Sequence, residues 1–522
     1  MDENLQNKLA ALPPERRQEL ERALGRLSKD SPRAPIQAKG LDHAPPSFAQ
    51  ARMLFLNELE PDSTQYSTSH TVRFTGSLKR QHLNDALSDL LHRQSILRSR
   101  FRRDGSKWTQ EIQPNENLIS NEFFEYHDMS VGSSKNQESD AQELVSSFLA
   151  QPFKLELGPL FRSQLIKLDN QQHLFSICIH HIVIDGMSLG VLVRDLSALY
   201  NARCTSKDAE LPDLSINYCD YSAWEKENAN TIGQKKSRDY WVQTLSDSPP
   251  VLDLPTDMPR PIHLSDQGAT TNFVLPAALL NDLRELGKRH NTTLFMTLTA
   301  GLQLLLARYC RTEDVVIGTP VNNRAPGCEN LIGLFLNTIV LRNKLLPEMT
   351  LEDWLTAVRT NTTEAFNHQD LPFEEVIRIL KPERTLAHAP LFSVMLVLQN
   401  SMDDLSFSLE GLQSSPQPQS RTTTKFDLLF NVRESAGELQ VSVGFSTDLF
   451  VEKTIKRICR HWKTVLSNMC EAKSSNRIQS LSILDEQECK RLGQHNPPPI
   501  TCLLYTSPSP RDQRGSRMPS SA

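Results

Sequence analysis

Two adjacent histidines, His180 and His181, are followed by Asp185 and Gly186. A histidine side chain has an ordinary pKa of about 6.5 and can accept or give a proton near neutral pH. A carboxylate four residues after His181 can close a turn by pairing with a base or an arginine, and a glycine leaves space for a backbone or a ligand to approach. These residue types at this spacing predict a site for proton transfer.

The elements around this segment must place the histidines at the edge of a folded unit. Residues 173–181 form an apolar run that is typical of a buried strand. Ser188 can cap a helix over residues 189–200, in which leucines recur at helical spacing. The histidines then lie between a strand and a helix, where side chains can face a cleft. A histidine pair in this position is also compatible with simple packing.

The rest of the chain mixes helical and strand patterns. The patterns predict a strand over 71–76, a helix over 82–94, an apolar helix over 293–310, a strand over 314–318 and a hairpin around Gly437. At 522 residues, this mixture predicts an α/β protein with two lobes of similar size.

We therefore divide the chain into four parts. Residues 1–40 are expected to hold a short helix over 12–27 and a linker, 41–215 the first lobe with the histidines, and 216–490 the second lobe. Residues 491–522 are expected to begin a linker to a further domain. The end of this part, CLLYTSPSPRD onward, resembles a translated sequencing adaptor, so the natural protein is expected to continue past about residue 500. A genuine disordered tail is the alternative.

Composition excludes several classes of function. The formal net charge of −5 gives no field that would attract nucleic acid or an anionic membrane. No apolar run reaches the roughly 20 residues of a spanning helix, and the polar, acidic N-terminus is unlike a signal peptide, so we expect a cytoplasmic protein. The nine cysteines are scattered without a C-x-x-C pair, which predicts neither a zinc site nor a disulfide framework.

The spacing HHxxxDG resembles the signature of an acyltransferase superfamily. Its members include chloramphenicol acetyltransferase, dihydrolipoyl acyltransferases, plant-type acyltransferases and the condensation domains of nonribosomal peptide synthetases. Further segments are similar to condensation-domain motifs in the family's order: 47–56 (S-x-A-Q-x-R-x-x-x-L), 93–101 (R-H-E-x-L-R-T-x-F), 218–224 (Y-x-D-Y-A-x-W), 254–261, 332–338 with Arg342 (I-G-x-F-V-N-T), and 369–374 (Q-D-x-P-F-E).

Two of these segments depart from the family. Gln94 and Ser95 replace the usual His-Glu, and Thr385 and Ala389 stand where Asp and Asn are common in the last motif, around Arg384 and 390–392. Most of the motifs also have a purely structural interpretation.

The resemblance implies two chloramphenicol acetyltransferase-like lobes in a V-shaped pseudodimer, with the active site in the channel between them. It implies amide formation between an acyl or peptidyl thioester on an upstream carrier protein and the amine of an aminoacyl thioester on a downstream carrier. The 4′-phosphopantetheine arms would belong to these partners, and no bound cofactor or metal is expected. An adenylation domain is expected to follow, because residues 481–496 resemble its lead-in.

The resemblance also assigns roles to the residues. His181 would act on the acceptor's α-amine, His180 and Asp185 would shape the turn, and Gly186 would keep the channel open. Arg98 and Asn337 would support the site, and we expect Arg98 to form a bidentate pair with Asp185.

Several alternatives remain open at this point. An epimerisation domain should carry E-G-H-G-R, a plant-type acyltransferase D-F-G-W-G, and a heterocyclisation domain aspartates in place of the histidines; none of these patterns is present. If Met1 is the true start, the donor would come from another polypeptide, or would be a fatty acyl group on a starter condensation domain. The altered Gln94-Ser95 keeps a non-catalytic recruitment platform open. The identity and stereochemistry of both substrates stay undetermined.

Overall fold

The computed structural model describes residues 35–115, 123–130, 136–229, 232–249, 252–382, 387–399, 406–417 and 423–495. The helix predicted over 12–27 and the adaptor-like tail lie outside these residues. Within the described ranges, no single helix is long and apolar enough to cross a membrane.

The first lobe is built on a five-stranded sheet with the order β12-β2-β7-β6-β5. The strands are β2 (Ser67–Gly76), β5 (Phe124–Asp128), β6 (Phe161–Lys167), β7 (Gln172–His180) and β12 (Leu412–Pro416). β7 pairs antiparallel with β2 and β6, and its last residue, His180, lies opposite Ser67. Every residue of β7 after Gln172 is buried, which explains its nearly unbroken apolar sequence.

Helices cover both faces of this sheet. Helices α4 (Arg80–Arg93) and α7 (Gly186–Thr205) share a core with Leu165 and Phe175 of the strands, whereas α6 (Gln137–Leu149) packs against Ile166 and Leu174. Adjacent strand residues point to opposite faces, so the two sets of contacts lie on opposite sides of the sheet. The smaller elements are β1 (His43–Ala44), α3 (Phe48–Leu59), β3 (Ser99–Asp104) and β4 (Lys107–Ile112).

The second lobe is built on a six-stranded sheet with the order β10-β9-β11-β13-β14-β8. The strands are β8 (Gly268–Leu275), β9 (Asp314–Asn322), β10 (Leu336–Lys344), β11 (Val394–Gln399), β13 (Leu428–Ser435) and β14 (Glu438–Ser446). The helices that share its core are α10 (Ala277–His290), α11 (Leu294–Cys310), α12 (Leu351–Asn367), α13 (Phe373–Leu380) and α14 (Glu452–Glu471). The predicted hairpin is β13–β14, and its turn uses Ala436 and Gly437, both at positive φ.

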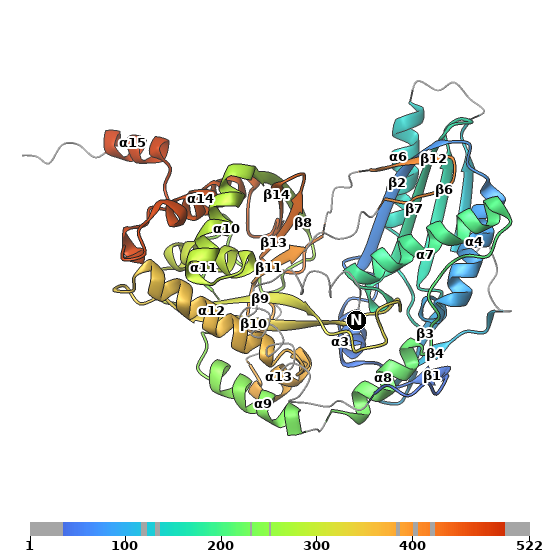
Figure 1. The fold of residues 1–522 in the computed structure, drawn as a ribbon, viewed down its shortest axis with the longest axis horizontal. Helices are drawn as coiled ribbons and strands as arrows, with labels where there is room; N and C mark the ends of the chain where they lie inside the picture. Colours follow the sequence, from blue (N-terminus) through green and yellow to red (C-terminus); the bar gives the residue numbers. More distant parts are fainter. Residues whose placement is uncertain are drawn as a thin grey trace, which may run out of the picture.

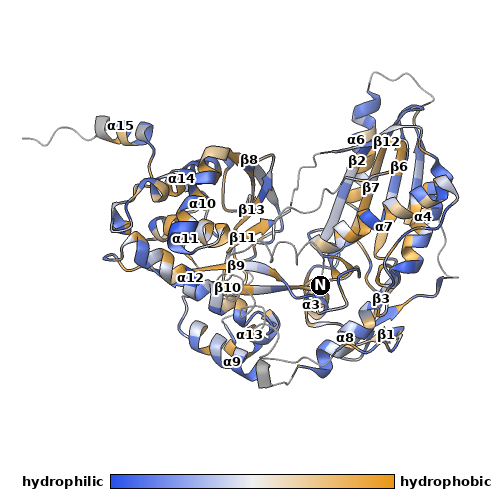
Figure 2. Ribbon diagram, viewed as in Figure 1, coloured by the Kyte–Doolittle hydropathy of each residue, from blue (hydrophilic) through white to orange (hydrophobic). Residues whose placement is uncertain are grey.

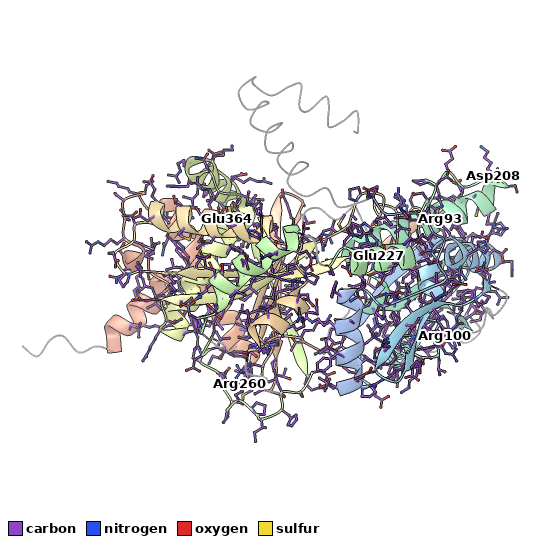
Figure 3. All side chains as sticks on the ribbon, turned by 90° about the horizontal axis from the view of Figure 1, so that it is seen from below. Arg93, Arg100, Asp208, Glu227, Arg260 and Glu364 are labelled. Atoms are coloured by element: carbon purple, nitrogen blue, oxygen red, sulfur yellow. The ribbon has the colours of Figure 1, made fainter. Side chains whose placement is uncertain are left out.

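The two lobes lie side by side, joined at one end by α8 (Tyr218–Glu227), α9 (Ile232–Leu245) and the β9–β10 pair (Figure 1). Hydrophobic residues concentrate on the strands of both sheets, and hydrophilic residues on the outer faces of the helices (Figure 2). Labelled charged residues such as Arg93 and Arg100 on the first lobe, and Arg260 and Glu364 on the second, are spread over both bodies (Figure 3).

The two cores do not divide at residue 215, where we expected the boundary. Tyr218, Tyr221 and Trp224 of α8 and residues 325–335 belong to the core of the first lobe. β12 also leaves the second half of the chain and pairs with β2 at the edge of the first sheet. Apolar side chains of these segments are buried against the first lobe, which the local sequence pattern does not reveal.

Candidate active site

The two histidines follow the end of β7, and their side chains have different surroundings. His180 is buried, and its Nδ1 accepts a hydrogen bond from the backbone N–H of Ile182 at 3.1 Å. Nδ1 therefore carries no hydrogen in the neutral ring. The ring packs edge-on against Phe153, with 6.1 Å between centroids. Burial, then the neighbouring His181 and Lys425, lower the pKa of His180 to about 3.

His181 begins a one-turn 3₁₀ helix, His181–Val183. Its backbone N–H donates to the carbonyl of Tyr66 at 2.7 Å, and its Nδ1 lies 2.6 Å from the carbonyl oxygen of Ile184. A carbonyl only accepts, so Nδ1 carries the hydrogen and Nε2 carries the lone pair. Burial, followed by the charge of Lys425, lowers the pKa of His181 to about 4. The ring is therefore neutral at pH 7, with a hydrogen-bond acceptor at Nε2.

Asp185 closes the turn and starts α7. It is the N-cap residue, and its Oδ1 accepts the backbone N–H of Ser188 at 2.7 Å. Its Oδ2 accepts the backbone N–H of Phe335 at 3.0 Å, which ties the turn to the strand entrance of β10. We expected Ser188 to cap this helix, and that was wrong. The Ser188 hydroxyl instead donates to the carbonyl of Gly333 at 2.8 Å and accepts the N–H of the same residue at 3.0 Å.

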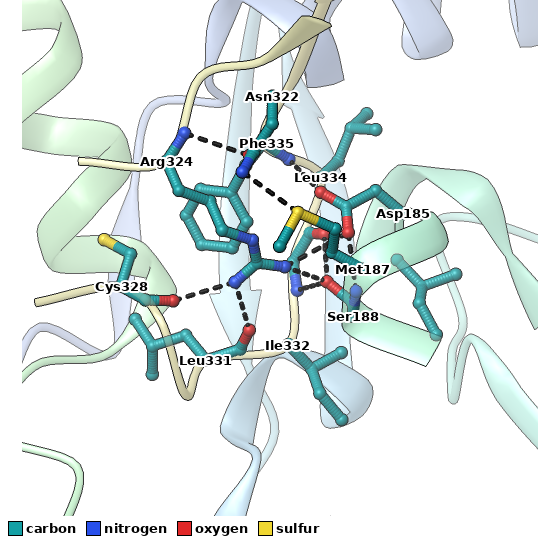
Figure 4. A network of polar contacts seen from close by, with 12 residues as sticks. Asp185, Met187, Ser188, Asn322, Arg324, Cys328, Leu331, Ile332, Leu334 and Phe335 are labelled. Carbon is teal, nitrogen blue, oxygen red and sulfur yellow. Dashed lines mark hydrogen bonds and ion pairs between the residues drawn. The ribbon is translucent and has the colours of Figure 1, made fainter. Parts of the chain in front are cut away.

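Arg324, from the loop after β9, is the residue that pairs with Asp185. Its Nη2 lies 3.1 Å from Oδ1 of Asp185 and 2.5 Å from the Ser188 hydroxyl, and its Nη1 donates to the carbonyls of Cys328 and Leu331. The guanidinium also stacks over the Phe335 ring, 4.2 Å from its centroid. Figure 4 shows this side chain reaching from its own loop to the start of α7. A buried cation from the second half of the chain therefore fixes the turn that follows the histidines.

The predicted pair between Arg98 and Asp185 is wrong. Arg98 ends a 3₁₀ helix, Ser95–Arg98, where its Nε donates to the carbonyl of Leu91 at 2.8 Å and its Nη1 to the carbonyl of Gln113. Backbone carbonyls hold this guanidinium. Sequence reasoning missed Arg324 because its local sequence, VNNRAPG, carries no sign of a partner 139 residues away.

Gln94, which replaces the family's histidine, is part of a buried contact. Its Nε2 donates to Asp195 of α7 and to the carbonyl of Asn330, both at 3.0 Å, and its Oε1 accepts the N–H of Ile332 at 3.0 Å. It therefore fastens residues 330–332 to the first lobe, and the histidine turn does not include it.

Asn337 and Gly186 complete the predicted set. The amide of Asn337 donates to the carbonyls of Gln369 at 2.6 Å and Leu371 at 2.8 Å, while its oxygen accepts the N–H of Phe373 at 3.0 Å. It thus joins β10 to the turn before α13. Gly186 is the first residue of α7, and a Cβ at this position would meet no atom within 4 Å.

The family model for the condensation domain matches residues 41–492 of this chain. The chain belongs to this family. It is a condensation domain of the nonribosomal peptide synthetase type, the class of enzymes that forms amide bonds. The family suspected from the HHxxxDG spacing and the ordered motifs is thereby confirmed.

Its relatives are much longer proteins. The chain is 37% identical over 86% of its length to chondramide synthase cmdD of Chondromyces crocatus, and 32% identical over 86% of its length to gramicidin S synthase 2 of Brevibacillus brevis. It covers only 11% and 10% of those two proteins. It is 34% identical to phosphinothricin tripeptide synthetase PhsC of Streptomyces viridochromogenes over 95% of this chain and 46% of that protein.

Solved structures share the fold. The X-domain in complex with OxyB from teicoplanin biosynthesis superposes with a TM-score of 0.78 at 25% identity, covering 87% of this chain and 99% of that one. The starter condensation domain of rhizomide synthetase RzmA superposes with a TM-score of 0.70 at 19% identity, covering 85% and 98%. The chloramphenicol acetyltransferase-like fold class predicted from sequence is confirmed by these similarities.

Proposed function

We propose that this domain joins a carrier-bound acyl or peptidyl thioester to the α-amine of a carrier-bound aminoacyl thioester. The observation that carries the proposal is the state of His181, whose ring is neutral and whose Nε2 is the acceptor nitrogen. The donor and acceptor would reach it on the 4′-phosphopantetheine arms of an upstream and a downstream carrier, with an adenylation domain as a further partner. We expect these reactions to take place in the cytoplasm.

The reaction then needs one well-placed acceptor of a hydrogen bond. The amine nitrogen attacks the thioester carbonyl, a C–N bond forms, and the carbonyl oxygen becomes an oxyanion. The oxyanion collapses, the C–S bond breaks, and the donor's pantetheine sulfur leaves as a thiolate. The attacking nitrogen loses one proton, which His181 Nε2 accepts and the thiolate finally takes up. The products are an amide on the acceptor carrier and a free thiol on the donor carrier.

His180, Asp185 and Arg324 do not need to touch the substrates in this scheme. His180 holds the N–H of Ile182, and Asp185 is fixed by Arg324, so the turn that carries His181 is supported on both sides. Two tethered reactants held face to face also gain from proximity, so His181 does not supply the whole acceleration. Asn337 and Gln94 are further supporting residues in the proposal.

The test is a coupling assay with two loaded carrier proteins. We expect His181→Ala to slow amide formation about 10²–10⁴-fold, the usual contribution of a positioned proton acceptor. The matched control is His263→Ala, which removes an exposed histidine of the second lobe and is expected to leave the rate unchanged. An unchanged rate in His181→Ala, with an unchanged thermal melting curve, would refute the role of His181.

The same assay separates the alternative functions. A fatty acyl donor that couples where peptidyl and aminoacyl donors fail would identify a starter domain. Binding of loaded carriers by the wild-type domain without any product would identify a recruitment platform. The known X-domain structure with OxyB supports testing this second case, because a domain of the same fold forms a complex with another protein there.

A further inference from the structure

Lys425 lies at a contact between the two lobes. It directly precedes β13 of the second sheet, and its Nζ lies 4.3 Å from the centre of the Tyr66 ring, which directly precedes β2 of the first sheet. Beside this cation–π contact, the side-chain amide of Gln65 donates to the carbonyl of Thr424 at 2.6 Å. Two neighbouring residues of each lobe therefore meet here.

The same contact reaches the active site. The backbone carbonyl of Tyr66 accepts the N–H of His181 at 2.7 Å, so the residue under the Lys425 ammonium also holds His181. The positive charge of Lys425 acts on both histidines, and it lowers the pKa of each in addition to the effect of burial.

The acidic groups nearby have partners of their own. Asp185 faces His181 and raises its pKa slightly, but this carboxylate is paired with Arg324. Asp427, two residues after Lys425, is held by Arg260, whose two terminal nitrogens lie 3.1 and 2.5 Å from its oxygens. Arg260 lies on the second lobe in Figure 3. His180, the remaining titratable neighbour of His181, is neutral at pH 7 because burial, His181 and Lys425 lower its pKa to about 3.

We propose that Lys425 is a positioning residue of the active site, whose ammonium group, brought across from the second lobe onto Tyr66, keeps the His181 ring unprotonated. The proposal rests on the function proposed above, in which Nε2 of His181 must accept a hydrogen from the acceptor amine. A free α-amine has a pKa of about 8, so many acceptors arrive as ammonium ions that could give their proton to an imidazole. An imidazolium has no acceptor nitrogen, and the charge of Lys425 disfavours that form.

The deciding experiment is a titration that does not need catalysis. His181 is followed by NMR in protein with ¹³C-labelled histidine, and its signal is assigned by its loss in His181→Ala. In Lys425→Met we expect the pKa of His181 to rise, while remaining below 6.5 because the burial is unchanged. Lys425→Arg keeps the charge and is expected to titrate like the wild type. An unchanged pKa of His181 in Lys425→Met would overturn the proposal.

The coupling rate gives a second readout. Where the pH lies below the pKa of His181, the rate should fall about tenfold for each unit by which that pKa has risen. We therefore expect the acid limb of the pH–rate profile to move to higher pH in Lys425→Met and to stay in place in Lys425→Arg. Lys107→Met, which removes an exposed lysine of β4, is the control. An acid limb in Lys425→Met that coincides with the wild type contradicts the proposal, whereas failure of the wild type to couple would contradict only the proposed function.

Discussion

Nη2 of Arg324 lies 3.1 Å from Oδ1 of Asp185, and the two side chains are only 5% and 1% exposed. Arg324 comes from the loop that follows β9, and Asp185 caps the helix that follows the histidines. The ion pair therefore connects the second half of the chain to the turn that aims His181.

Removing Arg324 should destabilise the protein strongly. Arg324→Met leaves the buried carboxylate of Asp185 without its cation, and the loss of one partner of a buried pair typically costs about 3–5 kcal/mol. Equilibrium unfolding in urea measures this change. A cost below about 1 kcal/mol would contradict the view that the pair holds the turn.

Arg98 provides the matched comparison for that pair. In a double-mutant cycle, Arg324→Met and Asp185→Asn should be non-additive because the two residues touch. Arg98→Met and Asp185→Asn should add within about 0.5 kcal/mol, because backbone carbonyls hold Arg98. A large coupling energy between Arg98 and Asp185 would restore the pairing that we first predicted.

Substitutions at Gly186 should separate stability from activity. A Cβ there meets no atom within 4 Å, so Gly186→Ala and Gly186→Leu should both fold, with melting temperatures at or above that of the wild type. If Gly186 keeps a path open for substrate, coupling should decrease from Gly to Ala to Leu. Equal coupling rates in all three proteins would show that substrate does not pass this residue.

The buried His180 should make stability depend on pH. Its pKa is about 3 in the folded protein, while the unfolded chain binds a proton below about 6.5. The unfolded state therefore binds more protons, and stability falls as the pH drops from 6.5 towards 3, by up to about 1.4 kcal/mol per pH unit for this group. His180→Asn retains an acceptor for the Ile182 N–H and should remove that part of the slope. Urea unfolding at pH 7, 6 and 5 compares the two proteins, and identical slopes would contradict the assignment.

Asn337 should matter for its hydrogen bonds rather than its size. Asn337→Ala leaves the buried carbonyls of Gln369 and Leu371 without their donor and should cost about 1–3 kcal/mol. Asn337→Asp keeps an acceptor for Phe373 but turns an oxygen towards both carbonyls, so it should cost at least as much. Thermal melting tests both variants, and a neutral Asn337→Asp would count against this role.

The sequence by itself determined the elements around the active site and the family. The apolar run of β7, the helix after Asp185 and the Ala436-Gly437 hairpin are specified by neighbouring residues, since burial pattern, caps and turns act over a few positions. The order of the motifs was sufficient to indicate a condensation domain, which the family match then confirmed.

Only the tertiary structure decided which side chains meet at those elements. Arg324 rather than Arg98 reaches Asp185, Lys425 lies on Tyr66, and β12 joins a sheet made by the first half of the chain. These partners lie far apart along the chain. Their pairing depends on how the two lobes pack, because burial and charge neutralisation favour it only once distant segments are brought together.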